Sequence, residues 1–190
     1  MSTPEVWLVR HAQTEWSELG RHTGRTDIPL TETGRGKARE LRGRLGGHRF
    51  ALVLTSPLSR ARETCELAGY GDQAQPRDEL MEWDYGEYEG LTTAEIRERR
   101  PGWLLWRDGC PGGETAEDVA RRVDRVIAEA LQADGDVALF AHGHVLRVLG
   151  ARWLEQPPQV GARLMLGTAA ISVLGAEREV RALRTWNMTG

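Results

Sequence analysis

The sequence predicts an α/β fold, a three-layer α/β/α sandwich built around a mostly parallel sheet. Apolar runs at residues 5–9, 51–55 and 136–141 are short and nearly continuous, as expected of strands that are covered on both faces. Helix candidates alternate with these runs, and such alternation is typical of a parallel sheet. Two further strand candidates, 169–175 and 179–186, follow each other closely. They predict a hairpin and thus one antiparallel edge strand.

The helix candidates are recognised by their ends and by their apolar spacing. Ser56 and Pro57 predict an N-cap and a first helical position, and Gly69 predicts the end of that helix. Thr115 opens a second helix, in which one apolar stripe recurs at helical spacing. This stripe consists of Val119, Val123, Val126, Ile127, Ala130 and Leu131. A third helix is predicted over 33–45 on weaker grounds, because the three glycines within it disfavour a helix.

Length and composition narrow the class of protein. A chain of 190 residues suits one domain with a sizeable core, predicted over 1–190. The net charge of -3 gives no reason to expect a nucleic-acid partner. The N-terminus lacks a basic stretch before an apolar segment, and no apolar run approaches the roughly 18 residues of a membrane span. The two cysteines lack metal-type spacing, so we expect a reduced, soluble, cytoplasmic protein without a membrane partner.

Two of the predicted strands end in histidine. Arg10 and His11 follow the run at 5–9, and His142-Gly143-His144 follows the run at 136–141. Open α/β sheets bind ligands at the carboxyl ends of their strands. Arg10 is a poor core neighbour for an imidazole because a guanidinium cannot lose its charge, but its fork matches phosphate oxygens. The sequence therefore predicts one site with two imidazoles and a bound phosphate.

A second arginine and a carboxylate are candidates for the same site. Arg60 falls in the first turn of the helix after strand 51–55, where the helix N-terminus also favours an anion; Arg62 is equally well explained as a surface residue. Glu82 lies in a loop of aromatic and acidic residues, flanked by Met81 and Trp83. Partial desolvation there suits a general acid. Spacing alone does not separate Glu82 from three competing carboxylates. The competitors are Asp84, Glu87 and Glu89.

Several other residues have two interpretations. His144 is a substrate contact, a residue that supports one, or simply the start of the next helix. Four cations, Arg21, His22, Arg25 and Arg107, form either a second anion site at the pocket rim or a set of solvated surface charges. Three tryptophans are expected in the core or in packing under a flap rather than against a ligand. These are Trp103, Trp106 and Trp153.

Other chemistries lack their sequence signals. The histidines do not have zinc-ligand spacing with carboxylates or thiolates. A glycine-rich phosphate loop with lysine and a GxSxG elbow are both absent, and Lys37 is the single lysine. The sequence therefore predicts a site that uses no metal and no cofactor.

Together these motifs resemble the histidine phosphatase superfamily, which includes cofactor-dependent phosphoglycerate mutases and many phosphomonoesterases. The family's Arg-His-Gly signature appears as Arg10-His11-Ala12. The segments that match after it are Thr14-Glu15-Trp16, Thr23-Gly24, Leu30-Thr31, Ser56 to Ala61, Glu82 before Tyr85-Gly86, and His142-Gly143. A closer resemblance joins the chain to fungal sedoheptulose-bisphosphatase-type enzymes and actinobacterial acid phosphatases. It is carried by residues 13–17, 82–90, 106–110 and 141–144.

The resemblance implies a reaction through a phosphohistidine. His11 attacks phosphorus in line, while a backbone carbonyl holds its other ring nitrogen. Arg10, Arg60 and His142 stabilise the charge on the phosphate oxygens. Glu82 protonates the leaving alcohol and then helps to deprotonate the water that hydrolyses the intermediate.

The resemblance also implies a set of substrate- and phosphate-binding residues. They are Ser17, Thr23, Gly24, Tyr85, Gly143 and His144. The chain departs from the family pattern at Ala12, which replaces glycine and is expected to add a methyl close to the phosphate pocket. Ser17 stands where mutases carry asparagine, which favours a phosphatase.

The expected activity is hydrolysis of small phosphorylated metabolites, including sugar phosphates or bisphosphates, so the expected partner is a small phosphate ester. Two rivals are a phosphoglycerate mutase-type phosphotransferase and a non-catalytic module that binds phosphorylated ligands. The short segment between Glu82 and His142 argues against the mutase. The retained site residues argue against the binding module. The sequence does not fix the substrate or the oligomeric state, for which a homodimer is one alternative.

Overall fold

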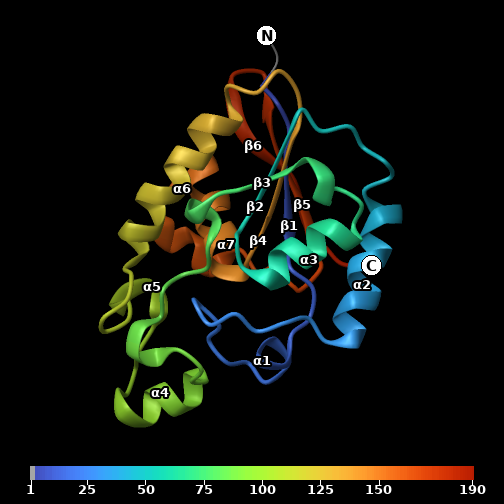
Figure 1. Cartoon of the computed structure of the whole chain (residues 1–190). Coiled ribbons are helices and arrows are strands. Elements are labelled where there is room, and N and C mark those ends of the chain that lie inside the picture. Colours follow the sequence, from blue (N-terminus) through green and yellow to red (C-terminus); the bar gives the residue numbers. More distant parts are fainter. Residues whose placement is uncertain (1–2) are drawn as a thin grey trace.

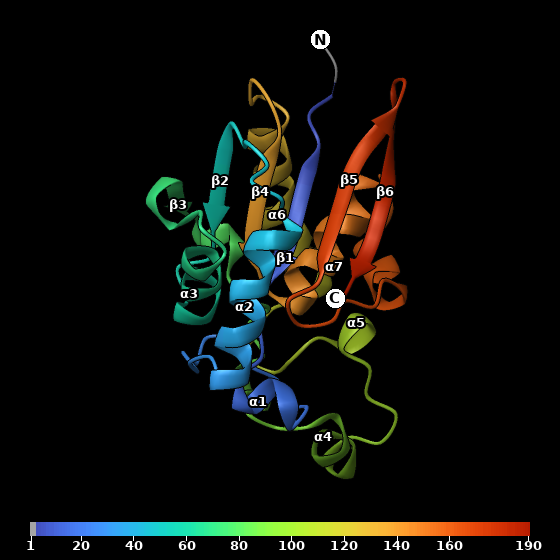
Figure 2. The ribbon, with the colours of Figure 1, turned by 90° about the vertical axis from the view of Figure 1, so that its right-hand side faces the viewer.

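The computed structural model describes residues 3–190, which form a three-layer α/β/α sandwich around a six-stranded sheet. The strand order is β3-β2-β4-β1-β5-β6, and Figure 2 shows the strands side by side. The strands are β1 (Val6–Arg10), β2 (Leu52–Thr55), β3 (Ala74–Pro76), β4 (Val137–Ala141), β5 (Ile171–Glu177) and β6 (Val180–Met188). The predicted fold class is confirmed, and four of these strands pair in parallel from β3 to β1.

The strand that runs against the others is β5, and it is not the edge strand that the sequence predicted. It pairs antiparallel with β1 and again antiparallel with β6. The predicted hairpin is present, but its second arm turns back and takes the edge position, so β6 runs in the same direction as β1. The sequence also missed β3 on the opposite edge, because Ala-Gln-Pro has neither an apolar run nor alternation.

Helices cover both faces of the sheet. Figure 1 shows α6 and α7 on one side and α2 and α3 on the other. The α-helices are α1 (Glu15–Glu18), α2 (Glu32–Arg44), α3 (Ser59–Leu67), α4 (Thr93–Arg99), α5 (Leu105–Asp108), α6 (Ala116–Ala130) and α7 (Gly143–Trp153). Four 3-10 helices span Gly71–Gln73, Asp78–Leu80, Gly86–Tyr88 and Pro158–Arg163. Within residues 3–190, no helix has both the length and the apolar character needed to cross a bilayer.

The helix ends follow local chemistry. Thr31 caps α2 through the N–H of Gly34, and Thr115 forms a capping box with Asp118 at the start of α6. The end of α3 is also as predicted, with Gly69 at a φ of +91° just beyond the cap.

The predicted start of α3 is wrong by two residues. Leu58, rather than Ser56, is the N-cap residue, and it makes no side-chain cap bond. The backbone N–H of Ser56 instead donates to Phe140 O, which continues the pairing of β2 with β4. The Ser56 hydroxyl contacts His142 Nε2 at 2.7 Å. Ser56 therefore remains part of the extended chain and contributes to the site. Arg60 still lies in the first turn.

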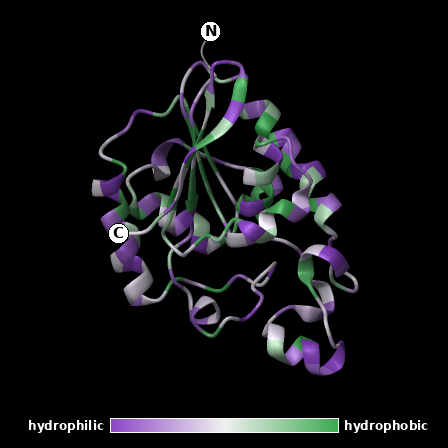
Figure 3. Cartoon of the chain, turned by 180° about the vertical axis from the view of Figure 1, so that it is seen from behind, coloured by the Kyte–Doolittle hydropathy of each residue, from purple (hydrophilic) through white to green (hydrophobic). Residues whose placement is uncertain are grey.

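The hydrophobic core has one part on each face of the sheet. Alternate residues of β1 divide between them: Val6 and Leu8 belong to the cluster under α6 and α7, and Val9 belongs to the cluster under α2 and α3. Figure 3 shows the hydrophobic residues gathered on the strands. Trp103 and Trp153 are buried in the first cluster, and Trp106 packs against it partly buried, as the sequence predicted.

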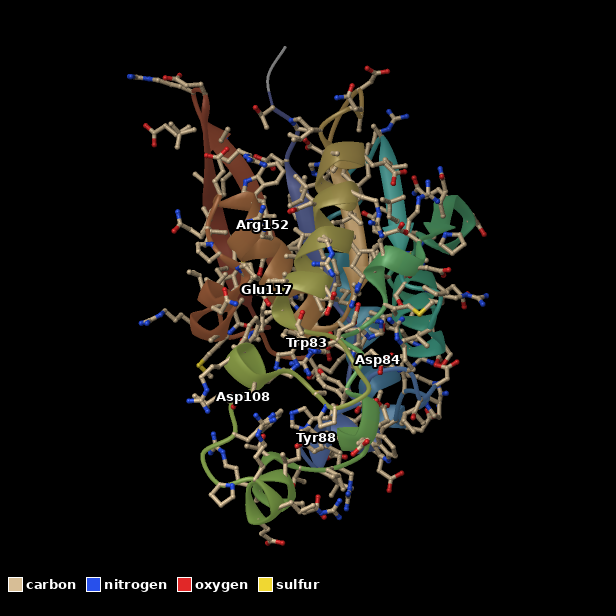
Figure 4. All side chains as sticks on the ribbon, turned by 90° about the vertical axis from the view of Figure 1, so that its left-hand side faces the viewer. Trp83, Asp84, Tyr88, Asp108, Glu117 and Arg152 are labelled. Carbon is tan, nitrogen blue, oxygen red and sulfur yellow. The ribbon has the colours of Figure 1, made fainter. Side chains whose placement is uncertain are left out.

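Two irregular segments, residues 14–31 and 83–114, form a cap over the carboxyl ends of the strands. They contain α1, α4 and α5, which lie below the sheet in Figure 1. Backbone bonds from His22 N to Leu91 O and from Gly90 N to His22 O join the two segments. Figure 4 shows Tyr88 and Asp108 within the cap. This cap and the ends of β1 and β4 position the site.

Candidate active site

A pocket of about 270 Å³ lies between the cap and the carboxyl ends of β1 and β4. Its wall contains eight of the eleven residues that the sequence assigned to the site. These are Arg10, His11, Ser17, Thr23, Glu82, Tyr85, Gly143 and His144. Arg21, His22 and Arg147 also line it. The wall is thus rich in cations and imidazoles, which suits a small anionic ligand.

His11 presents one ring nitrogen to this pocket. Its Nδ1 lies 2.7 Å from the carbonyl oxygen of Ala12, so Nδ1 is the protonated nitrogen and donates, which leaves the Nε2 lone pair free. Burial, and then the charges of Arg10 and Arg60, lower the pKa of His11 well below its usual value of 6.5. The imidazole is therefore neutral at pH 7, and its free nitrogen is a potential nucleophile.

The second strand-terminal histidine lies beside the first, as predicted. The ring centroids of His11 and His142 are 5.2 Å apart. Nδ1 of His142 accepts from Arg60 Nε at 3.1 Å, and its Nε2 is bonded to Ser56 Oγ. Burial and the charge of Arg60 lower the pKa of His142 well below 6.5, so this ring is neutral too.

Arg60, which the resemblance expects to stabilise charge on the phosphate oxygens, is fully buried and does not line the pocket. Its terminal nitrogens donate to the backbone carbonyls of Thr23, Gly24 and Thr26. The hydrogen-bond donors of the guanidinium are thus bonded to the cap loop and to His142, and Arg60 holds both in position. Its charge still acts on His11 at short range, as the lowered pKa of His11 records.

Arg10, unlike Arg60, lines the pocket directly. Its Nη1 donates to Leu166 O, while its Nε is buried without a hydrogen-bond partner among the described residues. The guanidinium lies against the backbone of Gly143, where a Cβ would come within 3.2 Å of Arg10 Cζ. Glycine at 143 thus permits the close approach that brings this cation to the start of α7. An unpaired buried N–H is costly unless a ligand accepts from it.

Glu82 is the pocket carboxylate, and it caps the first turn of α7. Oε2 accepts from the backbone N–H of His144, and Oε1 accepts from those of Val145 and Trp83, all at 2.8–2.9 Å. These donors belong partly to the free N–H groups that every helix start presents. Oε2 accepts one of these bonds and Oε1 two, so Oε2 is the oxygen with room for a proton.

The three competing carboxylates have other partners or positions. Asp84 accepts from Gly86 N and lies 3.8 Å from Arg25. Glu89 accepts from the N–H groups of Gly24 and Thr26, and Glu87 is exposed. Figure 4 shows Asp84 where the cap meets the body of the molecule. The structure therefore separates Glu82 from alternatives that spacing left equal.

The Ser17 and Thr23 hydroxyls reach the pocket edge from the cap. Ser17 forms a capping box with Thr14 at the start of α1, and the Thr23 hydroxyl donates to Arg21 O. Gly24 lies behind them, where a Cβ would come within 2.6 Å of both Trp83 O and Glu89 Oε2. Gly24 is therefore required for close packing of the two cap segments.

The expected methyl of Ala12 is not at the phosphate pocket. Ala12 is fully buried and belongs to the core cluster that contains Val9 and Leu30. Its backbone N–H donates to Thr64 Oγ1 at 3.1 Å. The side chain points into the core while the carbonyl serves His11, so alanine leaves the pocket unobstructed.

The buried Tyr85 and the partly buried His144 form a hydrogen-bonded pair in the pocket wall. The Tyr85 hydroxyl lies 2.5 Å from His144 Nδ1. Burial raises the pKa of Tyr85 well above 10, and burial with the charge of Arg147 lowers the pKa of His144 well below 6.5. Both groups are therefore neutral at pH 7. A phenol donating to Nδ1 places the remaining ring proton on Nε2.

Only part of the predicted rim cluster reaches the pocket. Arg21 and His22 line it, whereas Arg25 is placed near Asp84 and Glu114, and Arg107 is paired with Asp108 on the surface. Arg147 lines the pocket and was missed by the sequence reasoning. Its position one turn after His144 on α7 was an available signal.

Arg147 is held by two neighbouring groups. Its guanidinium lies 4.9 Å from the Trp106 ring centroid and donates to Gly161 O and Ala162 O.

Among residues 3–190, no group of three or more His, Cys, Asp and Glu side chains is placed to hold a metal ion.

A fold of this class with two neutral histidines and an arginine at the strand ends is that of a phosphate-transferring enzyme. The family model described as "Histidine phosphatase superfamily (branch 1)" matches residues 6–189. The chain belongs to this family, as the sequence motifs predicted, and it is a hydrolase of the phosphatase type.

Two of its relatives carry the names of the predicted subgroup. The chain is 44% identical over 188 residues to an acid phosphatase of Mycobacterium tuberculosis, covering 96% of this chain and 92% of that protein. It is 38% identical over 183 residues to the sedoheptulose 1,7-bisphosphatase of Saccharomyces cerevisiae, covering 80% and 68%. A solved structure of a Mycobacterium tuberculosis open reading frame product superposes with a TM-score of 0.92 at 41% identity, covering 98% of both chains.

Proposed function

We propose that this protein is a phosphomonoesterase of small phosphorylated metabolites that works through a phosphohistidine on His11. The observation that carries the proposal is the state of His11, a neutral imidazole with Nδ1 fixed by Ala12 O and Nε2 free at a cationic pocket. Such a nitrogen attacks phosphorus without first losing a proton.

In the first step the Nε2 lone pair of His11 forms a bond to phosphorus while the bond from phosphorus to the ester oxygen breaks. The leaving oxygen takes a proton from Glu82, for which Oε2 is the oxygen with room. In the second step water attacks phosphorus and gives its proton to Glu82. The P–N bond then breaks, its electron pair returns to Nε2, and inorganic phosphate leaves.

The cations have different tasks in this scheme. Arg10 contacts the phosphate directly, because it lines the pocket beside Gly143 at the start of α7. Arg60 works one layer away, where it holds the Thr23–Thr26 carbonyls and His142 and lends its charge to the site. Ser17, Thr23 and the start of α7 complete the phosphate environment.

The other end of the pocket supports a substrate with a second anionic or polar group. Arg147 and Arg21 line it together with His22 and His144, so a charged end and several donors face the non-reacting part of the substrate. A sugar bisphosphate carries one phosphate for the reacting site at His11 and a second phosphate that Arg147 and Arg21 can bind. A relative that acts on sedoheptulose 1,7-bisphosphate fits this proposal.

The covalent step is tested by trapping. Wild-type protein, quenched in alkali within a turnover of ³²P-labelled substrate, is expected to carry acid-labile label on His11, and His11→Ala is expected to lose both label and turnover. His48→Ala is the matched control, because His48 does not line the pocket and instead packs on Trp7 and bonds Asp136 just before the start of β4. Turnover without label, or label at another residue, contradicts the phosphohistidine on His11.

A phosphate-release screen ranks the substrates and distinguishes a phosphatase from a mutase. Sugar mono- and bisphosphates are compared with p-nitrophenyl phosphate and 3-phosphoglycerate. Sugar bisphosphates are expected to give the highest kcat/KM. A preference for p-nitrophenyl phosphate over every metabolite would remove the bisphosphate assignment, and 2-phosphoglycerate formed from 3-phosphoglycerate without phosphate release would identify a mutase.

A further inference from the structure

The loop that carries Glu82 has no sheet partner to hold it. It runs from the short helix Asp78–Leu80 through Glu82 into the cap and lies outside the strands. A general acid must be kept within hydrogen-bond reach of the oxygen that it protonates. An irregular segment does not supply that precision by itself, so the fixation has to come from side chains.

One buried arginine supplies it. Arg122 lies on α6, and its residue is 7% exposed. Its Nη1 donates to Glu79 O and Met81 O at 2.6 and 2.7 Å, and its Nη2 donates to Glu82 O at 3.1 Å. A single rigid guanidinium thus binds three carbonyls of the acid-bearing loop, which a flexible ammonium does not do as precisely.

The same guanidinium fixes the chain just after Glu82 through a carboxylate. Glu114 accepts from Arg122 Nε and Nη2 at 2.8 and 3.0 Å. Its Oε2 also accepts from Asp84 N, and its backbone carbonyl accepts from Trp83 Nε1, both at 2.8 Å. Figure 4 shows Trp83 and Asp84 next to each other below the helices. The loop is therefore held on both sides of Glu82.

The Glu82 side chain is set by its own backbone position and by α7. Its carboxylate bonds to Trp83 N and to two N–H groups of α7. A shift of the loop by an ångström would separate the carboxylate from α7 and from the reacting oxygen together. Such a misplacement is costly for a proton transfer.

We infer that Arg122 is a positioning residue, which fixes the Glu82 loop so that the carboxyl group reaches the leaving oxygen of the substrate. This inference rests on the proposed role of Glu82. Loss of Arg122 then impairs protonation of the leaving group, as loss of Glu82 does, and leaves attack by His11 largely intact. A purely structural role would lower activity equally for every substrate.

The test measures kcat/KM for phosphate esters whose leaving alcohols range from p-nitrophenol to simple alkanols. Arg122→Gln is expected to lower activity about tenfold or more on alkyl phosphates and less than about threefold on p-nitrophenyl phosphate. Arg122→Lys is expected to fall between this variant and the wild type. In the double variant Glu82→Gln/Arg122→Gln, the dependence on the leaving group is expected to equal that of Glu82→Gln alone, because the positioned group is gone.

Arg125→Gln is the matched control, because the exposed Arg125 lies on the same helix and contacts the same loop only through the half-buried Glu79 side chain. It is expected to leave the leaving-group dependence unchanged. Circular dichroism and a thermal melt establish folding, and Arg122→Lys supplies the same readout if Arg122→Gln does not fold.

The outcomes separate the two proposals. The positioning role is overturned if the Arg122 variants lose kcat/KM equally for all esters while Glu82→Gln loses more for poor leaving groups. The acid role of Glu82 then stands. If Glu82→Gln itself leaves the dependence of kcat/KM on the leaving group unchanged, both the acid role and the inference that rests on it are overturned. An Arg122 effect that adds fully to the Glu82→Gln effect also overturns the inference.

Discussion

Single side chains set the charge of this site, and burial sets their protonation. His11, His142 and His144 all have pKa values well below 6.5, mainly through burial. Each has a defined partner for Nδ1, namely Ala12 O, Arg60 Nε or the Tyr85 hydroxyl. The imidazoles therefore act as neutral groups with fixed tautomers, and the permanent positive charge comes from arginine.

Arg147 is the residue expected to discriminate between substrates. Arg147→Gln is expected to raise KM for a sugar bisphosphate about tenfold or more, because a charged contact to a second phosphate is lost. KM for the matching monophosphate is expected to change by less than about twofold, since the reacting phosphate lies at the Arg10 end. Steady-state kinetics on the two substrates make the measurement.

Arg107→Gln is the control for this prediction. Arg107 belonged to the same sequence-predicted rim cluster but is paired with Asp108 on the surface, so its loss is expected to leave both KM values unchanged. An equal rise in KM for the mono- and the bisphosphate in Arg147→Gln would show that Arg147 does not bind the second phosphate.

At this scale the sequence predicted which strand-terminal residues come together better than it predicted the residues that hold them in place. His11, Arg10 and His142 were found because they follow strands, which brings them to one edge by topology alone. Arg122 and Arg147 were missed because each occurs within a helix among other charges, where sequence does not separate a buried guanidinium from a solvated one. The hydrogen bonds of Arg60 to the carbonyls of Thr26 and Gly24 were not predicted either, because these carbonyls come from a distant loop.

Helix α2 illustrates how an element can depend on one contact outside itself. Its glycines weakened the sequence prediction, yet α2 forms over Glu32–Arg44. At Gly34 a Cβ would lie 2.2 Å from Gln13 O, whereas at Gly36 it would meet no heavy atom of the described chain within 4 Å. Gly34 is thus required by the approach of the chain that follows His11, and Gly36 has no such requirement.

These two glycines give a paired prediction. Gly36→Ala is expected to stabilise the protein by about 0.5–1 kcal/mol, because alanine has the higher helix propensity and restricts the unfolded chain. Gly34→Ala is expected to destabilise it by about 1–3 kcal/mol, because the added methyl must displace backbone. Urea unfolding of both variants and the wild type measures the difference. Stabilisation by both substitutions would contradict the close contact at Gly34.

Elements with a strong local pattern were predicted, and short ones were not. The apolar runs gave β1, β2 and β4, and the stripe with its Thr115 cap gave α6. The cap helices α4 and α5 are too short for a helical period to stand out from the loop around them. The edge position of β6 also depends on pairing between distant strands, which no local pattern encodes.

The whole molecule is expected to lose stability in mild acid. Three buried histidines have folded pKa values well below their unfolded value of about 6.5. The neutral rings therefore contribute stability that is fully present above about pH 6.5 and is lost as the pH falls through the folded pKa values. Each contributes a slope of roughly 1.4 kcal/mol per pH unit in that window, or about 4 for the three.

Urea unfolding between pH 7.5 and 5 measures this slope. The shifted carboxylates, Glu95, Asp108 and Asp118, have pKa values lowered from 4.5 or 3.8, so their protonation falls below that range. His144→Gln is expected to remove about one third of the slope. A free energy of unfolding that stays constant from pH 6.5 to 5 would contradict the burial of neutral rings.

The division of the pocket between sheet and cap has a consequence for how its selectivity can change. The proposed nucleophile His11, Arg10 and the proposed acid Glu82 are anchored to the end of β1 and to the first turn of α7. Arg21, His22 and Thr93 come from the cap segments. Loops accept replacement and insertion more readily than strands do. Grafting new sequence into residues 19–22 or 91–95, which leaves Thr23 unchanged, should therefore redirect this enzyme toward other phosphate esters while its reacting end stays in place.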